Sequence, residues 1–347
     1  MKILFYGELY PDVVHGVSMA NRLNTGFLSE QYHIDFVQET TDIHTIGSTS
    51  IAKIKLIISS TFKISKCTRQ VEYDVFYTVL SLSLMGIIKN FLSILSFSLF
   101  SKGRVVVHIH RGDFKAFYRS SVMHRLFVQT VFKQIDRLIV LSAGQKIEMA
   151  EFFSENAIFA VENSVLEEFH YPKKIHFNQN FIFISNYIKE KGIFDLLNVF
   201  NQRKDLKLDC YGAFNNNELA LKNFQSDSVS IHHVIKGEDK FDAIYQADAL
   251  ILPSWNEGQP TILLEAMMVG TIILTTKVGL IDELLGEDYP FYFDPKNVES
   301  LKECIDKFLA YDQKTMLSRK LKEHYFERYS QDNHKVKILN AFSEKIR

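Results

Sequence analysis

Short apolar runs alternate with segments of helical periodicity along most of the chain. Six buried strands are expected first, at residues 2–6, 33–37, 74–79, 104–109, 137–141 and 157–161. Six more are expected further along, at residues 181–185, 206–211, 228–233, 249–253, 271–276 and 291–294. Helical patterns lie between most of these runs, and this alternation favours parallel sheets covered by helices on both faces.

A polar stretch, HYPKKIHFNQN at residues 170–180, separates the two series of strands and is typical of a linker. The chain has 347 residues, which is enough for two domains that each have a core. We therefore predict an α/β protein with two Rossmann-like domains, 1–168 and 169–325, followed by a C-terminal helix over 326–347. Ligands of such sheets bind beyond the carboxyl ends of the strands, so the loops after the strands are the first place to look for chemistry.

Charge is unevenly distributed, although the net charge of the chain is only −1. Residues 51–137 contain 14 Lys and Arg against 4 Asp and Glu, so the rest of the chain is acidic. A basic segment in an otherwise acidic chain indicates that one face of the first domain meets something anionic. The three cysteines lie far apart without metal-ligand spacing, which favours a reducing compartment and no disulfide framework.

An apolar stretch at residues 82–100, LSLMGIIKNFLSILSFSLF, is long enough to cross a membrane. Lys89 and four serines interrupt it, which favours a buried helix; an interfacial membrane contact and a true span are the alternatives. The neighbouring basic run at 51–70 supports the interfacial contact, because cationic apolar helices bind anionic leaflets. The amino terminus becomes polar after one short apolar run, so no signal peptide is expected.

The stretch NEGQPTILLEAMMVG, residues 256–270, follows a buried strand and reads as the start of a helix. Pro260 has a fixed φ suited to the first helical position. The backbone N–H groups of Gly258, Gln259 and Thr261 should therefore point out of the helix start. Together with the helix dipole they would form an anion site suited to phosphate.

Two glutamates flank this helix start. Glu265 lies one turn beyond Thr261 on the same side, about 6 Å further along the axis, which is close to the separation of a diphosphate from its ribose. Glu257 lies at the other end of the phosphate site, where a sugar attached to the diphosphate would be. The spacing therefore suits a nucleotide-diphosphate sugar, although a glutamate such as Glu265 can also serve only as a helix cap.

The segment LPSWNEGQPTILLEAMMVGTIILTTKVGLIDELL resembles the carboxy-terminal signature of the family-4 retaining glycosyltransferases, whose hallmark is Glu-x7-Glu. The resemblance covers the whole chain. It implies the GT-B fold, in which the parallel sheets of two Rossmann-like domains face each other across a cleft and C-terminal helices return to the first domain. It also implies that Glu265 binds the nucleotide ribose, and that Glu257 holds the transferred sugar with the amides of Gly258 and Gln259.

The same resemblance extends to the turns that follow. Gly279 and Glu283 match the family's Gly-Gly-x-x-Glu turn, with Leu280 in place of the second glycine. By resemblance, the loops at 211–217 and 232–240 flank the nucleotide base.

The segment FIFISNYIKEKGIFDLL, residues 181–197, resembles the family segment that carries an arginine and a lysine for the leaving diphosphate. Lys191 matches the lysine, whereas Asn186 occupies the arginine position. Neutralisation of the phosphate must therefore rely on Lys191, on helix amides, or on a substitute such as Lys189 or Arg111.

Two residues of the first domain are further candidates. Gly16 precedes a helix and can let the backbone approach a phosphate or sugar, although the family has two glycines where this chain has His15 and Gly16. His110 follows a very hydrophobic strand, and the family carries a histidine there that contacts the donor sugar. His108 lies on the same face by alternation and is expected to be a core residue.

These features predict a retaining, metal-independent glycosyltransferase with Glu257, His110 and Lys191 as catalytic residues. The predicted reaction moves a hexosyl-type sugar from a nucleotide-diphosphate sugar, with UDP favoured and GDP next, to a saccharide or lipid-linked saccharide. Such acceptors belong to surface polysaccharides such as capsule, O-antigen or exopolysaccharide. No cofactor is expected beyond the donor, and the chain shows no Asp-x-Asp loop or ligand cluster for a metal. Neither a G-x-G-x-x-G nor a Walker sequence occurs, which argues against nicotinamide cofactors and ATP hydrolysis.

The expected partners are the donor, the acceptor and an anionic membrane in peripheral contact with residues 51–137. Nucleic acid is not expected, because no nucleic-acid-binding module surrounds the basic segment. The predicted location is the cytoplasm, with that contact on the inner face of the cytoplasmic membrane. Two alternatives are a GT-B sugar-nucleotide epimerase, which needs no acceptor, and a non-catalytic sugar-nucleotide-binding subunit, which Asn186 would favour.

Overall fold

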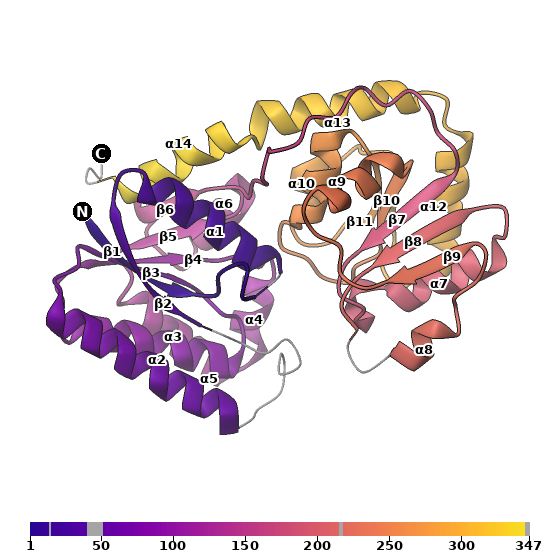
Figure 1. The fold of residues 1–347 in the computed structure, drawn as a ribbon. Helices are drawn as coiled ribbons and strands as arrows, with labels where there is room; N and C mark the ends of the chain where they lie inside the picture. The colour runs from indigo at the N-terminus through magenta and orange to yellow at the C-terminus, as the bar shows by residue number, and fades with distance from the viewer. Residues whose placement is uncertain (14, 40–50, 215–217, 344–347) are drawn as a thin grey trace. The chain divides into compact units, whose positions relative to one another are not determined.

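The computed structural model describes residues 1–13, 15–39, 51–214 and 218–343. It divides into two compact units, one formed by Met1–Ser164 with Asp332–Arg347 and the other by Val165–Gln331. Each unit contains one six-stranded sheet within the described residues (Figure 1). All twelve expected strands are present there, with each end within one residue of the expected position. The predicted α/β architecture with two parallel sheets is confirmed.

The sheet of the first unit is parallel throughout and has the strand order β2-β1-β3-β4-β5-β6. Its strands are β1 (Lys2–Gly7), β2 (His33–Gln38), β3 (Val75–Val79), β4 (Arg104–His108), β5 (Arg137–Val140) and β6 (Ile158–Ala160). Its α-helices are α1 (Gly16–Ser29), α2 (Ile51–Gln70), α3 (Leu84–Ser98), α4 (Phe114–Ser120), α5 (Val122–Phe132), α6 (Ala143–Met149) and α14 (Gln331–Phe342).

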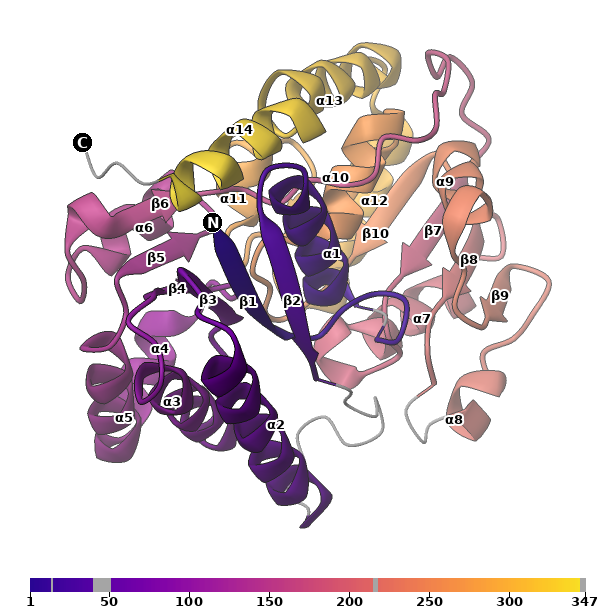
Figure 2. The same ribbon diagram turned by 60° about the vertical axis from the view of Figure 1, so that its left-hand side comes forward.

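Strand alternation explains how this sheet buries both of its faces. Ile3 and Phe5 of β1 pack in a cluster with residues of α1 and α14, while Leu4 and Tyr6 pack in a second cluster with residues of the helices from α2 to α6. Both faces therefore need apolar side chains, and the strands read as nearly continuous hydrophobic runs. Figure 2 shows the helices on the two sides of this sheet.

The apolar stretch at 82–100 forms α3, whose inner face is buried against the sheet. Lys89, which interrupts the stretch, has a side chain only 14% exposed, and its Nζ lies 2.6 Å from Glu39 Oε2. An ion pair satisfies a charge that would otherwise be costly inside the protein. Among the described residues, no helix is both long and apolar enough to cross a membrane.

The last helix, α14, is fastened to the first unit by buried polar contacts. One ring nitrogen of His334 lies 2.7 Å from the Glu162 carbonyl oxygen, and the other lies 2.6 Å from Asn24 Oδ1. Arg137 also donates to the Ala341 carbonyl oxygen at 2.7 Å. The helical end of the chain thus divides between the units, because α13 belongs to the second unit and all but the first residue of α14 to the first.

The sheet of the second unit is also parallel and has the order β12-β11-β10-β7-β8-β9. Its strands are β7 (Asn180–Ile184), β8 (Lys207–Tyr211), β9 (Val229–His232), β10 (Ala249–Leu252), β11 (Ile272–Thr276) and β12 (Tyr292–Phe293). Its α-helices are α7 (Ile193–Gln202), α8 (Glu218–Lys222), α9 (Gly237–Gln246), α10 (Thr261–Val269), α11 (Ile281–Leu285), α12 (Val298–Ala310) and α13 (Lys314–Arg328).

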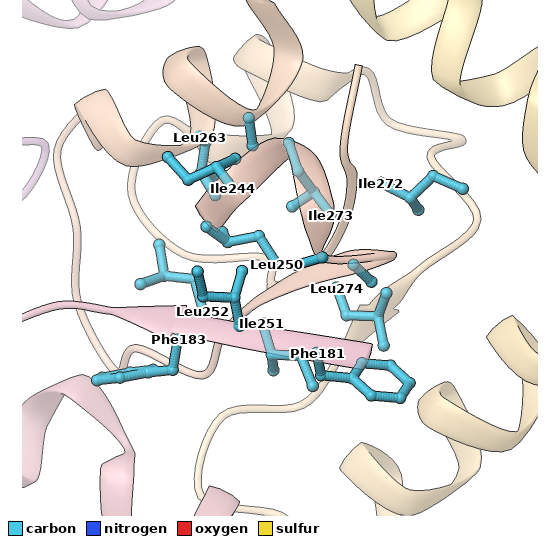
Figure 3. Close-up of a cluster of buried hydrophobic side chains, with 14 of the residues drawn as sticks. Phe181, Phe183, Ile244, Leu250, Ile251, Leu252, Leu263, Ile272, Ile273 and Leu274 are labelled. Carbon is cyan, nitrogen blue, oxygen red and sulfur yellow. The ribbon is translucent and has the colours of Figure 1, made fainter. Parts of the chain in front are cut away.

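The core of the second unit has two layers, one on each face of the sheet (Figure 3). Leu250 and Ile273 are neighbours in register and lie on the side of Ile244 from α9 and Leu263 from α10. Phe181 lies on the other side, where its ring contacts rings of α7 and α12. This packing places α9 and α10 side by side over the same face of the sheet.

Candidate functional site

The loops that follow β7 and β10 meet at the carboxyl edge of the second sheet. Gly192 has φ +70, and a Cβ added to it would lie 2.1 Å from the Pro253 carbonyl oxygen. The Trp255 N–H donates to the Glu190 carbonyl oxygen at 2.8 Å. A side chain at position 192 would push these loops apart, so glycine is required for this close approach.

Helix α10 starts in the β10 loop, one residue later than the sequence suggested. Pro260 is the N-cap, with an extended backbone of φ −69 and ψ 120, and Thr261 is the first helical residue. The proline is therefore not the first helical residue, although its φ matches that position. No side chain caps this helix. The Leu263 N–H donates to the Pro260 carbonyl oxygen at 3.1 Å, whereas the N–H groups of Thr261 and Ile262 have no backbone acceptor among the described residues and point out of the helix start, along the dipole.

Lys191 and Glu257, which the sequence nominated separately, lie in direct contact. Lys191 ends the short 3-10 helix Lys189–Lys191, and its Nζ lies 2.6 Å from Glu257 Oε1. The Glu257 side chain is only 9% exposed and that of Lys191 is 25% exposed. Glu257 lies three residues before Pro260, so this carboxylate and the Lys191 ammonium group both lie close to the start of α10.

The turn after β11 packs against the backbone of Glu257 and Gly258. Gly279 has φ +64, and a Cβ there would lie 1.9 Å from the Glu257 carbonyl oxygen. The Leu280 N–H donates to the Gly258 carbonyl oxygen at 3.1 Å. Leu280 itself has φ −107, so the second glycine of the family turn is not needed here.

Glu265 is buried inside α10 and is paired with a residue that the sequence analysis missed. Lys240 of α9 places its Nζ 2.6 Å from Glu265 Oε1, and the two side chains are 11% and 3% exposed respectively. Since Glu265 makes this pair and α10 has no side-chain cap, Glu265 is not a capping residue. The sequence could have indicated Lys240, because this lysine lies near the start of the helix α9, which follows the strand β9 of the same sheet.

Asn186 lies between β7 and the 3-10 helix, and its side chain makes no hydrogen bond among the described residues. Of the two proposed substitutes, Arg111 belongs to the first unit and is bonded to Asp113. Lys189 lies in the second unit, with its Nζ 5.7 Å from the centre of the Trp255 ring. Lys296 approaches the same ring at 4.7 Å, so two cations surround the one tryptophan of the chain.

Aromatic rings gather at the ends of β8 and β9, in the loops expected near the base. The rings of Tyr211 and His232 stack with centres 4.6 Å apart. Phe214 and His233 meet edge to face at 5.0 Å. Residues 215–217 of the first loop lie outside the described part of the chain.

Gly16 and His110 both lie in the first unit. Gly16 is the exposed first residue of α1, and His15 caps that helix by accepting from the Ser18 N–H. His110 is buried two residues after β4, and its Nε2 has no hydrogen-bond partner among the described residues. Burial lowers the pKa of His110 to about 3, so its imidazole is neutral at physiological pH.

His108 is fully buried and packs against His110, with ring centres 3.9 Å apart. It also lies within hydrogen-bond distance of the Tyr77 hydroxyl. The ring contact between His108 and His110 is expected for two side chains on the same face of a strand. The complete burial of His108 is consistent with the core role predicted for it.

The predicted site residues therefore fall into two groups by unit. Those of the second unit gather at the carboxyl edge of one sheet; they are Asn186, Lys191, Glu257, Gly258, Gln259, Pro260, Thr261 and Glu265. Within the described residues, no three His, Cys, Asp or Glu side chains come together as metal ligands would. Metal independence stays a prediction.

Residues 169–325 match the family described as Glycosyl transferases group 1. This range lies within the second unit and contains both glutamates and both lysines of the site. The second unit carries a glycosyl transferases group 1 domain.

Two glycosyltransferases are similar to this chain in sequence. TuaC of Bacillus subtilis, whose name assigns it to teichuronic acid biosynthesis, is 23% identical over 205 residues, which are 59% of this chain and 52% of TuaC. MJ1607 of Methanocaldococcus jannaschii, an uncharacterised glycosyltransferase, is 27% identical over 107 residues, which are 30% of this chain and 27% of that protein. The matched part is thus about half of TuaC and about a quarter of MJ1607.

Solved structures resemble the chain over most of its length. Sucrose-phosphate synthase of Thermosynechococcus elongatus has a TM-score of 0.78 at 14% identity, covering 99% of this chain and 98% of that one. TarM of S. aureus has a TM-score of 0.64 at 16% identity, covering 82% and 59% respectively. These likenesses and the group 1 domain confirm a fold of the GT-B type.

Replacement of Gly279 by alanine should test whether this turn positions Glu257. Gly279→Ala adds a left-handed strain of about 1 kcal/mol and a collision with the Glu257 carbonyl. Gly237→Ala is the control, since Gly237 has φ +58 but open space around its Cβ. Both variants should melt at a lower temperature than the unaltered chain, and Gly279→Ala at the lower temperature of the two. Equal melting temperatures would show that the turn yields without displacing Glu257.

Proposed function

We propose that this chain is a retaining, metal-independent glycosyltransferase that uses a nucleotide-diphosphate sugar, with UDP favoured and GDP next. The acceptor would be a saccharide or lipid-linked saccharide in the assembly of a surface polysaccharide. The observation that carries the proposal is the Lys191–Glu257 pair beside the start of α10, in a group 1 domain. The name of TuaC refers to teichuronic acid biosynthesis, and a TarM structure contains UDP, which supports both the process and the donor class.

The donor diphosphate would bind at the amino-terminal end of α10. The N–H groups of Thr261 and Ile262, which make no backbone hydrogen bond among the described residues, and the helix dipole favour an anion there. Lys191 gives one N–H to Glu257, and an ammonium group has two further donors for phosphate oxygens. Lys191 can therefore bridge the carboxylate and the diphosphate without leaving Glu257.

In this proposal, stabilisation of the leaving group drives the reaction. The bond between the anomeric carbon and the diphosphate oxygen breaks, and Lys191 with the helix amides stabilises the negative charge that develops. The acceptor hydroxyl attacks on the face that the diphosphate leaves, which retains the anomeric configuration, and its proton passes to the departing phosphate oxygen. Glu257 and His110 orient the sugar and form no covalent bond to it.

Nucleotide binding should be visible through the single tryptophan. Trp255 is two residues from Glu257, so a bound diphosphate sugar should change its fluorescence. UDP, GDP and ADP would each be titrated with and without EDTA, and melting temperatures measured in parallel. At a hundred times its Kd, a ligand stabilises the native state by about 2.7 kcal/mol. A response to one nucleotide that EDTA leaves unchanged is expected; no response to any of them would contradict the proposal.

Replacement of Glu257 by glutamine should separate transfer from binding. Glu257→Gln keeps the size of the side chain but removes its charge, so we expect turnover to fall by about a hundredfold or more, with nucleotide affinity largely retained. Glu299→Gln, an exposed glutamate on α12, is the control. Turnover would be measured as nucleoside diphosphate release with saccharide acceptors, and the product anomer by NMR. Isomerised donor without transfer would instead indicate an epimerase.

We also propose that α2 brings the first unit to an anionic membrane where lipid-linked acceptors reside. Ile54, Ile58 and Phe62 recur every four residues along one face of α2 and are 50%, 63% and 69% exposed. Lys55 and Lys63 lie next to this stripe and are also exposed, and the helix contains no acidic residue. An apolar stripe flanked by lysines suits the interface of an anionic leaflet.

The double replacement Ile58→Asp with Phe62→Asp should release the protein from vesicles containing anionic lipid. Leu219→Asp is the control, because Leu219 is an apolar residue on α8 of the other unit and is 82% exposed. Flotation with and without salt would measure binding. Binding to anionic vesicles that survives the double replacement would contradict the role of α2.

A further inference from the structure

The reaction proposed above gives no role to Lys240, a residue of α9 in the second unit. It lies in the second turn of α9 and reaches across to α10, where its Nζ contacts Glu265 Oε1 at 2.6 Å. Both side chains are largely buried, at 11% and 3% exposure. The pair therefore joins two helices that pack side by side on the same face of the sheet.

Stability alone is a weak reason for such a pair. The cost of removing two charges from water is often as large as their attraction, and apolar side chains of similar size would hold the helices equally well. The geometry of the carboxylate offers a better reason. Glu265 Oε1 is held by Lys240, whereas Oε2 has no partner among the described residues and is not sealed from solvent. One oxygen is thus fixed and the other is available as an acceptor.

We propose that Lys240 is the positioning residue for ribose recognition, acting through Glu265. This inference rests on the proposed function, in which Glu265 accepts hydrogen bonds from the ribose hydroxyls. Lys240 would hold the carboxylate in the rotamer that points Oε2 at the sugar. It would also offset the negative charge of Glu265, which otherwise repels the diphosphate bound one helical turn away.

The test compares UDP with 2′,3′-dideoxy-UDP, which differ only in the ribose hydroxyls; the GDP and ADP pairs would be run alongside. A hydroxyl bonded to a carboxylate contributes about tenfold or more to affinity. The unaltered chain should therefore prefer the ribose form by about tenfold or more, and Glu265→Gln should lose most of that preference.

Lys240→Met keeps the length of the side chain and removes its charge. We expect it to reduce the ribose preference to nearly the level of Glu265→Gln, while the dideoxy form loses little affinity. Lys240→Arg should recover part of the preference. Lys236→Met is the matched control, because Lys236 is the N-cap residue of the same helix, is exposed and makes no ion pair with a carboxylate among the described residues.

A combined variant, Lys240→Met with Glu265→Gln, guards against a folding defect in Lys240→Met, which leaves a carboxylate buried without its cation. If Lys240 acts through Glu265, the combined variant should have the same ribose preference as Glu265→Gln alone. A Lys240→Met protein that melts lower but keeps the full preference would overturn the inference and leave the proposed function intact. Failure of the unaltered chain to bind any of the three diphosphates would overturn the proposed function itself.

Discussion

The close approach of two loops, Gly192 against the Pro253 carbonyl, is the constraint on which the site depends. The loops follow β7 and β10, which are neighbours in a parallel sheet and therefore end at the same edge. Lys191 and Glu257 are 66 residues apart in the chain and meet only because these loops touch. A β-carbon at position 192 would separate the cation from the carboxylate, so the ion pair is a consequence of backbone geometry.

Two lysine–glutamate pairs then determine the electrostatics of the second unit. A diphosphate would be repelled by the bare carboxylates of Glu257 and Glu265, which lie beside and within the helix that would bind it. Lys191 and Lys240 each neutralise one of them. This arrangement also bears on Asn186, where the related family has arginine. Lys191 is already paired with Glu257; Lys189 is a second cation of the same loop, with its Nζ 5.7 Å from the centre of the Trp255 ring.

In the first unit, a buried polar network attaches α14 to the rest of the unit. His334 contacts both the Glu162 carbonyl and the Asn24 side chain, and burial lowers the pKa of His334 to about 4. His108 and His110 lie nearby in the same electrostatic environment and are neutral for the same reason. A neutral imidazole can accept as well as donate hydrogen bonds; the Nε2 of His110 is buried and has no partner among the described residues.

The sequence by itself determined the strands, the helices between them and the glutamates around the start of α10. These features depend on neighbours along the chain: hydrophobic alternation, and the chemistry of a helix start after a buried strand. The local pattern was wrong about Pro260, which it predicted as the first helical residue. Proline fixes φ at a value that suits a helix, but the loop sets the ψ of Pro260 at 120, which is extended. Only the tertiary structure decided that Lys191 contacts Glu257 and that Lys240 contacts Glu265. Such contacts depend on which strands are adjacent and which helices pack together, and the spacing of residues in one segment carries no information about either.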